Sequence, residues 1–491
     1  MAKAIPPAQN GEQLSVSTKL FYGFGSVAFG VKDQGFSYLL LIFYNQVVGL
    51  PSATVGLAIM IALIFDSFLD PIMGQVSDNT RSKWGRRHPY MYAAAIPVAV
   101  SYLMLWSPPD WSDQALFFYL IAVAIVIRSF ITMYEIPSAA LAAELTTHYD
   151  ERTKVLSYRY FFGWIGGLTM TLLAFQVFLK PDAEHAVGQL NPVGYQHYAL
   201  AASGVMLFAI LLSAIGTHRH IPRLKMPPLR KLTLPQLGRE MVGTLSHRSF
   251  LVLMGAGVFN AMAMGLVLSL NLYFNTYFWQ LNAQQISIFV LGNFVSAGLA
   301  FAFAAPLSMR LGKKTTAQLT KLLAFVIGVT PIALRLLGLF PENGDPLVVP
   351  ILFAQTVVST AFSIVSAILI SSMIADVVED SELRTGRRSE GLFFAAAAFI
   401  NKAVTGVGIF ASSMILALIA FPAGAQPGSV SEEVVRNLGL VYVPVLGGLY
   451  ATAILFVSLY RITREGHEES LRKLAAAAAE LEEPAPPGAG R

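Results

Sequence analysis

The sequence predicts an all-α, polytopic membrane protein with twelve transmembrane helices in two six-helix parallel pseudo-repeats. The first observation is composition: 55% of the 491 residues are hydrophobic and only 13% are charged, whereas soluble domains carry about 25% charged residues. The second is that apolar runs of about 20 residues, the length that crosses a bilayer, recur along almost the whole chain. The third is that positive charge is concentrated in every second loop.

The apolar runs fall into two groups of six, separated by a polar stretch. The predicted spans are 20–47, 52–76, 90–107, 114–144, 157–179 and 197–217, then 249–279, 284–308, 317–340, 346–375, 391–421 and 438–460. This order predicts five segments: an N-terminal segment (1–18), a first six-helix half (19–217), a linker (218–248), a second half (249–460) and a tail (461–491).

Loop charge predicts the orientation. One set of alternate loops holds Arg81, Lys83, Arg86, Arg87, Arg152, Lys154, Arg219, Arg223, Lys225, Arg230, Lys231, Arg239, Arg248, Arg310, Lys313, Lys314, Arg384, Arg387 and Arg388; the other set holds only Lys180 and Arg436. By the positive-inside rule, the first set and both termini are cytoplasmic, in a multi-pass protein of the cell inner (plasma) membrane. Because the net charge of +5 sits in these short loops, no nucleic-acid partner is expected.

An internal repeat supports the six-plus-six division. A shift of 232 residues superposes Ala143, Glu144, Asp150, Arg152, Thr153, Ser157, Phe161 and Phe162 on Ala375, Asp376, Glu382, Arg384, Thr385, Ser389, Phe393 and Phe394 without a gap. Both segments begin in equivalent cytoplasmic loops, so the halves are predicted to be parallel repeats. Transporters with this arrangement bind their substrate between the halves, near mid-membrane.

Asp66 and Asp70 are the strongest candidate functional pair. Each is an ionisable side chain inside a predicted span, where a charge costs at least about 2.5–3.5 kcal/mol. Their i, i+4 spacing places both carboxylates on one helix face, and two close like charges are unfavourable unless a cation or proton lies between them. Pro71 leaves the carbonyl of Ser67 without its helical donor, and oxygen ligands suit a hard cation. The alternative is a pair neutralised by Lys32 or Lys402 with no bound ion.

Other charges fall within or at the ends of the spans: Lys32, Asp33, Arg128, Glu135, Arg159, Arg335 and Lys402. Arg128 and Glu135 are seven residues apart and share a helix face, so they are either functional or a structural salt bridge. Lys402 is either a fixed counter-charge for the first half or a direct participant in gating. Arg335 is near a helix end and can reach polar surroundings.

The loop after the second span reads Gly74-x-x-x-Asp78-x-x-Arg81-x-x-x-Gly85-Arg86-Arg87, which resembles the signature of the major facilitator superfamily. Such a resemblance implies a cytoplasmic gate whose ion pairs break and re-form during transport. Its shorter counterpart in the second half, after the eighth span, is Gly312-Lys313-Lys314. Asp376 and Arg384, further candidates for the gate, belong to the loop after the tenth span, which the repeat superposes on the loop after the fourth. The alternative is an ordinary basic loop.

Several function classes are disfavoured by what the sequence lacks. Cysteine is absent, which excludes thiol catalysis and thiolate metal sites. All eight histidines lie in loops or at span ends, and no motif of a hydrolase or nucleotide-binding enzyme stands out. No enzyme activity, no cofactor and no metal other than a coupling cation are therefore expected. A membrane enzyme or assembly factor without transport remains the alternative of another class.

The helix-2 motif D66-S-F-L-D70-P-I-M-G74, followed by T80-R-S-K-W-G85, resembles the glycoside–pentoside–hexuronide:cation symporter family of the major facilitator superfamily. The resemblance continues through Y22-G-F-G, V47-V-G-L, E135-I-P, A375-D-V-V-E and Lys402. It implies that Asp66, Asp70 and Thr132 bind the coupling cation, Na+ or H+. It also implies that Glu135, Arg159 and Lys402 belong to the substrate site, for which Arg128 and Asp33 are further candidates.

Three departures from the family pattern qualify these expectations. Leu69 replaces an asparagine that assists sodium binding, which favours proton coupling. Gly30 replaces the sugar-binding acid of helix 1, for which Asp33 is a substitute. Ala139 and Ala367 replace two tryptophans on which sugars stack, so polar contacts are expected to dominate and an anionic glycoside to bind better than a neutral one.

The predicted function is secondary active, cation-coupled symport of a glycoside, sugar or sugar acid by alternating access. The alternative within the same class is an amphipathic or lysolipid-like solute, because a family relative in animals looks like a sodium-coupled lysolipid carrier. The expected partners are the small-molecule substrate, the coupling cation and the lipid bilayer, and the protein is expected to be a monomer.

Overall fold

The structure is a computed structural model that describes residues 14–146, 149–223, 247–385 and 390–462. Its elements are α1 (Val16–Phe24), α2 (Val27–Gln34), η1 (Gly35–Leu39), α3 (Leu40–Ile42), η2 (Phe43–Val47), α4 (Ser52–Asn79), α5 (His88–Leu105), α6 (Asp113–Leu145), α7 (Tyr149–Leu173), η3 (Ala174–Phe178), η4 (Gly188–Leu190), α8 (Pro192–His218), η5 (Ile221–Arg223), α10 (Arg248–Tyr273), η6 (Phe274–Phe278), α11 (Ala283–Leu311), α12 (Lys313–Leu336), α13 (Val348–Thr385), α14 (Glu390–Leu418) and α15 (Glu432–Ser458). The predicted N-terminal segment, linker and tail fall mostly outside the described residues.

Every predicted span appears as helix within the described ranges. Ten of the helices found there are long and apolar enough to cross a membrane. The span at 90–107 corresponds to α5, and the span at 20–47 is a series of short helical pieces from α1 to η2. The all-α prediction is therefore confirmed. The largest boundary difference is in α13, which continues ten residues past the predicted end at 375, to Thr385.

The first membrane helix is interrupted rather than continuous. Gly25 and Ser26 separate α1 from α2, and the five-residue π-helical pieces η1 and η2 interrupt its second half. Comparable π-helical pieces end two other spans, η3 after α7 and η6 after α10. Such irregular turns redirect side chains and are frequent at functional sites.

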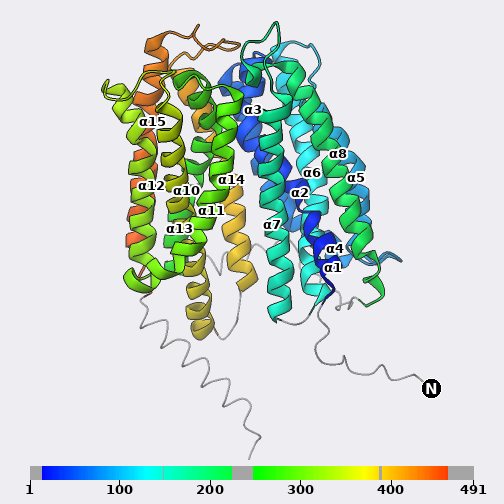
Figure 1. Cartoon of the computed structure of the whole chain (residues 1–491). Helices are drawn as coiled ribbons and strands as arrows, with labels where there is room; N and C mark the ends of the chain where they lie inside the picture. The colour runs from blue at the N-terminus through cyan, green and yellow to red at the C-terminus, as the bar shows by residue number, and fades with distance from the viewer. Residues whose placement is uncertain (1–13, 147–148, 224–246, 386–389, 463–491) are drawn as a thin grey trace, which may run out of the picture. The chain divides into compact units, whose positions relative to one another are not determined.

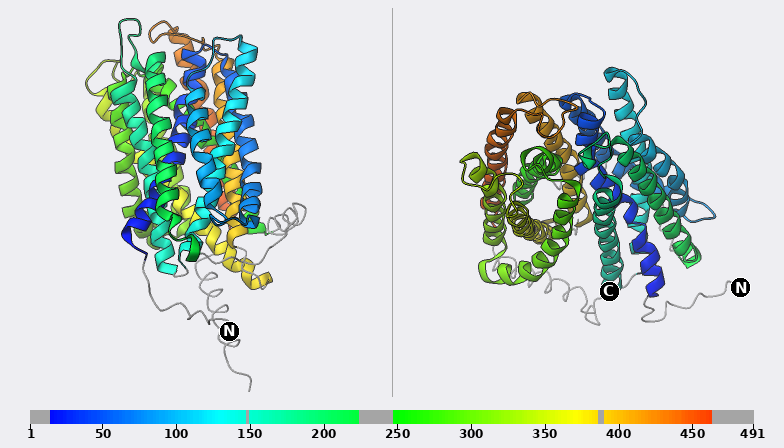
Figure 2. Two further views of the ribbon diagram at one scale, coloured as in Figure 1. Left: turned by 90° about the vertical axis from the view of Figure 1, so that its right-hand side faces the viewer. Right: turned by 45° about the horizontal axis from the view of Figure 1, so that its top comes forward.

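The described chain packs into two compact units. The first comprises the described residues within Met1–Lys231, Gly265–Val290 and Gly406–Val435, and the second those within Leu232–Met264, Leu291–Thr405 and Arg436–Arg491. Within the first unit α5 packs against both α6 and α8, while α2 packs against α7 and α4 against α6. Figures 1 and 2 show the helices of this unit from three sides. These units are defined by packing, so the six-helix halves inferred from the repeat stay a prediction.

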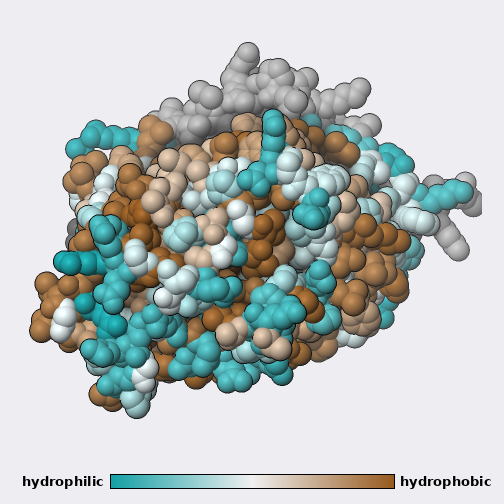
Figure 3. Space-filling view, turned by 90° about the horizontal axis from the view of Figure 1, so that it is seen from above, coloured by the Kyte–Doolittle hydropathy of each residue, from teal (hydrophilic) through white to brown (hydrophobic). Residues whose placement is uncertain are grey.

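Apolar side chains cover much of the exposed helix surface. Examples are Ile96, Phe118, Phe208, Phe301 and Leu418, each more than half exposed. A water-soluble monomer does not usually expose so much apolar area, whereas lipid accepts it. The face seen from above in Figure 3, where loops join the helices, mixes hydrophilic with hydrophobic residues.

Candidate functional site

Asp66 and Asp70 lie one turn apart on α4 and face α6. The Asp66 side chain is completely buried, and Asp70 is half-buried. Thr132 of α6 connects them, because its Oγ1 lies 2.9 Å from Asp66 Oδ1 and 3.0 Å from Asp70 Oδ1. The two aspartates and the threonine, which the sequence placed in one cation site, are therefore adjacent in the structure.

Arg128 lies one turn from Thr132 on α6 and neutralises Asp66. Its Nη1 donates to Asp66 Oδ2 at 2.6 Å, and its guanidinium stacks over the Phe36 ring, 4.4 Å from the centroid. The sequence suggested an Arg128–Glu135 salt bridge as one alternative, but in the structure Arg128 pairs with Asp66 of α4. Lys32, one of two lysines considered as a counter-charge for the aspartates, pairs with Asp33 at 2.6 Å.

The position of Thr132 between two carboxylates limits the hydrogen bonds that its hydroxyl can make. A hydroxyl has one hydrogen, so a single threonine cannot donate to both carboxylates at once. Both short distances are satisfied when one carboxyl is protonated and donates to Thr132 Oγ1, which then donates to the other.

Arg159 is held against α6 by neutral groups. Its Nη1 donates to Ser138 Oγ at 2.9 Å and its Nη2 to the Glu135 carbonyl at 3.2 Å. The guanidinium lies 4.8 Å from the Phe29 ring centroid, and the residue is 6% exposed. Two predicted substrate residues, Glu135 and Arg159, are thus neighbours, although the contact uses a backbone carbonyl.

Asp33 and Lys402 are the remaining predicted substrate residues. Asp33 exposes 59% of its side chain although it lies within the first span. Lys402 is half-buried on α14 in the second compact unit, and its role at the site stays a prediction.

The predicted gate motif is an ion cluster at one end of the first unit. Arg87 pairs with Asp78, donates to Ser77 Oγ at 2.6 Å and to Glu144 Oε1 at 2.8 Å. Arg86 reaches the same Glu144 oxygen at 2.8 Å. Gly85 begins this arginine pair with φ of 71°, a conformation that glycine adopts without strain. Gly74 and Arg81 occupy the end of α4 and the loop after it.

Glu144 is the gate residue that sequence reasoning did not assign. Its ion pairs join α6 to the loop after α4. The sequence contained a sign of this role, because the repeat superposes Glu144 on Asp376. Within the second unit Asp376 accepts from Lys313 Nζ at 2.6 and 2.9 Å. Each unit therefore has an acid paired with the loop bases. The Arg384 side chain lies outside the described part of the structure.

The opposite end of the first unit is joined by a buried polar network that the sequence did not reveal. Tyr273 donates to Asn45 Oδ1 at 2.7 Å, and Tyr277 donates to Gln46 Oε1 at 3.0 Å. Gln46 Oε1 also accepts from the Ala425 amide at 2.9 Å. Segments from both predicted halves are thus bound together at the end away from the Arg86–Arg87 loop.

Sequence reasoning also missed Lys321, a buried lysine on α12. Its Nζ donates to Asn260 Oδ1 at 2.6 Å and lies 4.9 Å from the Tyr450 ring centroid. The signal was present in the sequence, because Lys321 is an ionisable residue within the predicted span 317–340.

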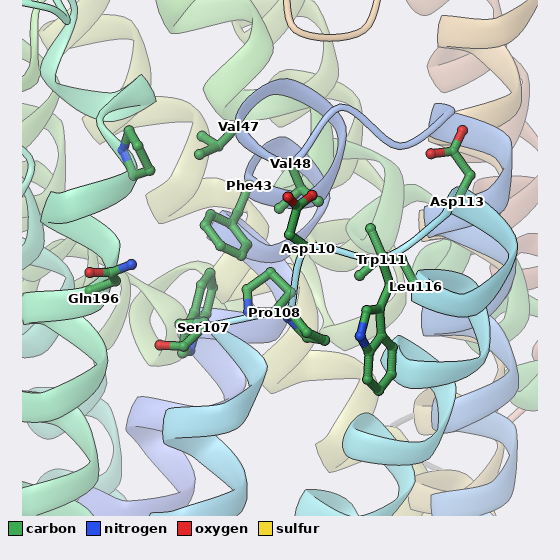
Figure 4. A pocket seen from close by; sticks show the side chains of 13 residues that line it. Phe43, Val47, Val48, Ser107, Pro108, Asp110, Trp111, Asp113, Leu116 and Gln196 are labelled. Carbon is green, nitrogen blue, oxygen red and sulfur yellow. The ribbon is translucent and has the colours of Figure 1, made fainter.

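A cavity of about 400 Å³ lies where η2 meets the loop after α5, and its side chains include Phe43, Ser107, Asp110 and Trp111 (Figure 4). It lies at the end of α5 away from the ion cluster. None of the predicted cation or substrate residues lines it, so this cavity is separate from the candidate site.

The sequence profile of the family described as MFS/sugar transport protein matches residues 21–464. An uncharacterized symporter of Synechocystis sp. is 27% identical, with 95% of this chain and 98% of the relative covered. A putative glycoside/cation symporter of Escherichia coli is 24% identical, with 94% and 95% covered. A sodium-dependent lysophosphatidylcholine symporter of Gallus gallus is also 24% identical, with 96% and 93% covered.

The crystal structure of a D-xylose-proton symporter superposes with a TM-score of 0.63, covering 92% of this chain and 98% of the other. At 14% identity this similarity concerns the fold alone. Together with the family match over residues 21–464, it confirms a fold of the major facilitator type.

Proposed function

The chain belongs to the MFS/sugar transport protein family and is a transporter rather than an enzyme, and from this premise we propose that it couples sugar or glycoside uptake to a proton gradient. The observation that carries the proposal is the chain of contacts from Asp70 through Thr132 and Asp66 to Arg128. The printed names of its relatives, a glycoside/cation symporter among them, support the substrate class.

Asp70 is the proposed proton carrier. In the loaded state its carboxyl proton is donated to Thr132, whose own hydrogen is donated to Asp66. Loss of that proton places a second negative charge beside Asp66, and the repulsion has to be relieved by a change in helix packing. The protonation state of Asp70 thus biases the transporter between conformations, as coupling requires.

Sodium is the competing coupling ion. Carboxylate and hydroxyl oxygens suit a hard cation, and the animal relative is named as sodium-dependent. Two features favour the proton. Arg128 already supplies a positive charge at Asp66, and the Leu69 side chain has no oxygen to offer a metal ion.

The test is uptake into proteoliposomes with an imposed gradient of either H+ or Na+, using a panel of radiolabelled methyl glycosides, a glucuronide and a lysophosphatidylcholine. Accumulation of a glycoside driven by a pH gradient in sodium-free buffer is the expected result. Accumulation only with a sodium gradient would contradict proton coupling. Uptake of the lysolipid alone would favour the second candidate, an amphipathic solute.

The proposed orientation places the Arg86–Arg87 ion cluster on the cytoplasmic side and the Asn45–Gln46 network on the outer side. It is supported by the concentration of positive charge in one set of loops. In an alternating-access cycle, the buried network of Asn45 and Gln46 then closes the outer side and separates when the substrate enters. We propose that the protein works in this way in the inner membrane, as a monomer.

A reporter fused after residue 232 is expected to lie in the cytoplasm, and one fused near residue 188 in the periplasm. The measurement is the activity of paired reporters, alkaline phosphatase and green fluorescent protein, each active on one side only. The opposite pattern at either site would reverse the assignment of inner and outer gates.

A further inference from the structure

A small pocket lies between the first and fifth membrane helices and brings an exposed acid next to exposed aromatic rings. Its volume is about 130 Å³, and its lining residues are Phe29, Gly30, Asp33, Gln34, Tyr160, Gly163 and Trp164. All of them belong to α2 and α7 within the first compact unit. From α7, Tyr160 and Trp164 are one turn apart and therefore share a face.

Glycines form the floor of this pocket. A Cβ added to Gly30 would lie 1.9 Å from the carbonyl oxygen of Gly163, and one added to Gly167 would lie 2.6 Å from the Gly30 carbonyl oxygen. The backbones of α2 and α7 therefore touch where any larger residue would separate them. This contact also explains why no acid stands at position 30, since its side chain has no room there.

The walls of the pocket are accessible. Asp33 exposes 59% of its side chain, Trp164 is 51% exposed and Tyr160 is 69% exposed. A carboxylate inside a membrane span faces water or protein rather than lipid, because its transfer into hydrocarbon is unfavourable. On this ground we infer that the pocket that Asp33 shares with Trp164 faces water rather than lipid.

We propose that Trp164, with Tyr160 beside it, is the aromatic platform on which a pyranose ring of the transported glycoside packs while Asp33 accepts hydrogen bonds from its hydroxyls. This proposal rests on the proposed function and names a subsite for it. An aromatic ring offers a flat apolar surface to the C–H face of a sugar, and an ionised carboxylate forms short, strong hydrogen bonds with hydroxyl donors.

The neighbouring charges suit this role. Lys32 is buried and pairs with Asp33 Oδ1 at 2.6 Å, which orients the carboxylate, and Asp33 also lines the pocket. A carboxylate has about four acceptor positions. Ala139 and Ala367 stand at the positions where the family has sugar-stacking tryptophans. In this proposal Tyr160 and Trp164 provide the rings instead, from α7.

The experiment is equilibrium binding of p-nitrophenyl glycosides, both hexosides and pentosides, to the full-length protein in nanodiscs. The wild type is compared with Trp164→Ala, Trp164→Phe and the matched control Phe161→Ala, another exposed aromatic residue of α7 that does not line the pocket. Thermal unfolding of each variant checks that folding is intact.

Trp164→Ala is expected to weaken binding of the best glycoside about tenfold or more, as loss of a buried aromatic anchor commonly does. Trp164→Phe should restore most of it, because a phenyl ring keeps the flat surface, and Phe161→Ala should bind as the wild type does. Asp33→Asn should lower the discrimination between the glycoside and its deoxy analogues, since that discrimination depends on the hydroxyl acceptor.

Two contrary results are distinguishable. Wild-type binding of a glycoside that Trp164→Ala leaves unchanged would overturn the platform and leave the proposed function standing. No binding of any glycoside by the wild type, with binding of a lysophosphatidylcholine instead, would overturn the proposed function and the platform together.

Discussion

Asp70→Asn is expected to abolish uphill accumulation of substrate while substrate binding and exchange persist. An amide resembles the protonated carboxyl in shape and can still donate to Thr132, so the loaded conformation remains available. It cannot release a proton, so the cycle loses the step that couples transport to the gradient. The measurement is accumulation in proteoliposomes with an imposed pH gradient, set beside exchange of labelled for unlabelled substrate at equilibrium.

Asp66→Asn is also expected to abolish accumulation, with some binding retained, but the reason differs. Asp66 is the ion-pair partner of the buried Arg128, so its replacement also leaves a positive charge without compensation. Comparison of the two variants is informative because both carboxylates have the same chemistry. If Asp70→Asn still concentrates substrate against its gradient, Asp70 is not the coupling residue.

Arg128→Ala is the substitution with the largest expected effect on stability. Removing one partner of a buried ion pair costs about 3–5 kcal/mol, because the other charge stays buried without that opposite charge beside it. Asp66 in this variant lacks its fixed counter-charge, and together with Asp70 and Thr132 it becomes a cluster of oxygen atoms open to a metal cation. We therefore expect a lowered melting temperature that 100 mM NaCl partly restores, in contrast to a wild type whose stability does not respond to sodium.

Arg335→Ala is the matched control for this experiment. Arg335 also lies in a membrane helix but donates to the Pro341 carbonyl at 2.6 Å, close to the helix end. Within the described residues Arg335 forms no ion pair with an acid, so the Arg335→Ala substitution breaks none there. A second control, choline chloride at the same concentration, tests for an effect of ionic strength. If NaCl changed the melting temperatures of the wild type and of Arg128→Ala equally, Arg128 would not occupy the place of a coupling cation.

Much of the architecture was predictable because the bilayer imposes simple rules on the chain. Length and hydropathy indicated the spans, since a membrane helix must bury its backbone polar groups within itself. The i, i+4 spacing of Asp66 and Asp70 placed their side chains on one face before any tertiary contact was known. The gate motif similarly placed Arg86 and Arg87 near Asp78 through local spacing.

The partner of each charge was not predictable in the same way. From the sequence alone, Arg128 could pair with Glu135, seven residues away on its own helix, or with Asp66 on another helix. Which carboxylate it binds depends on how α4 and α6 pack. The partners of Glu144 and Gln46 could not be predicted either, because they come from segments far away in the sequence.

The sequence by itself determined the membrane class, the number and approximate bounds of the helices, and the residue types available for coupling, because these follow from periodicity and composition along one chain. The tertiary structure alone decided that Arg128 compensates Asp66, and that Trp164 lies beside Asp33. The physical reason is that side-chain pairing between helices depends on their relative rotation and spacing. Here those are set by close contacts such as Gly30 on Gly163, which no single-helix pattern encodes.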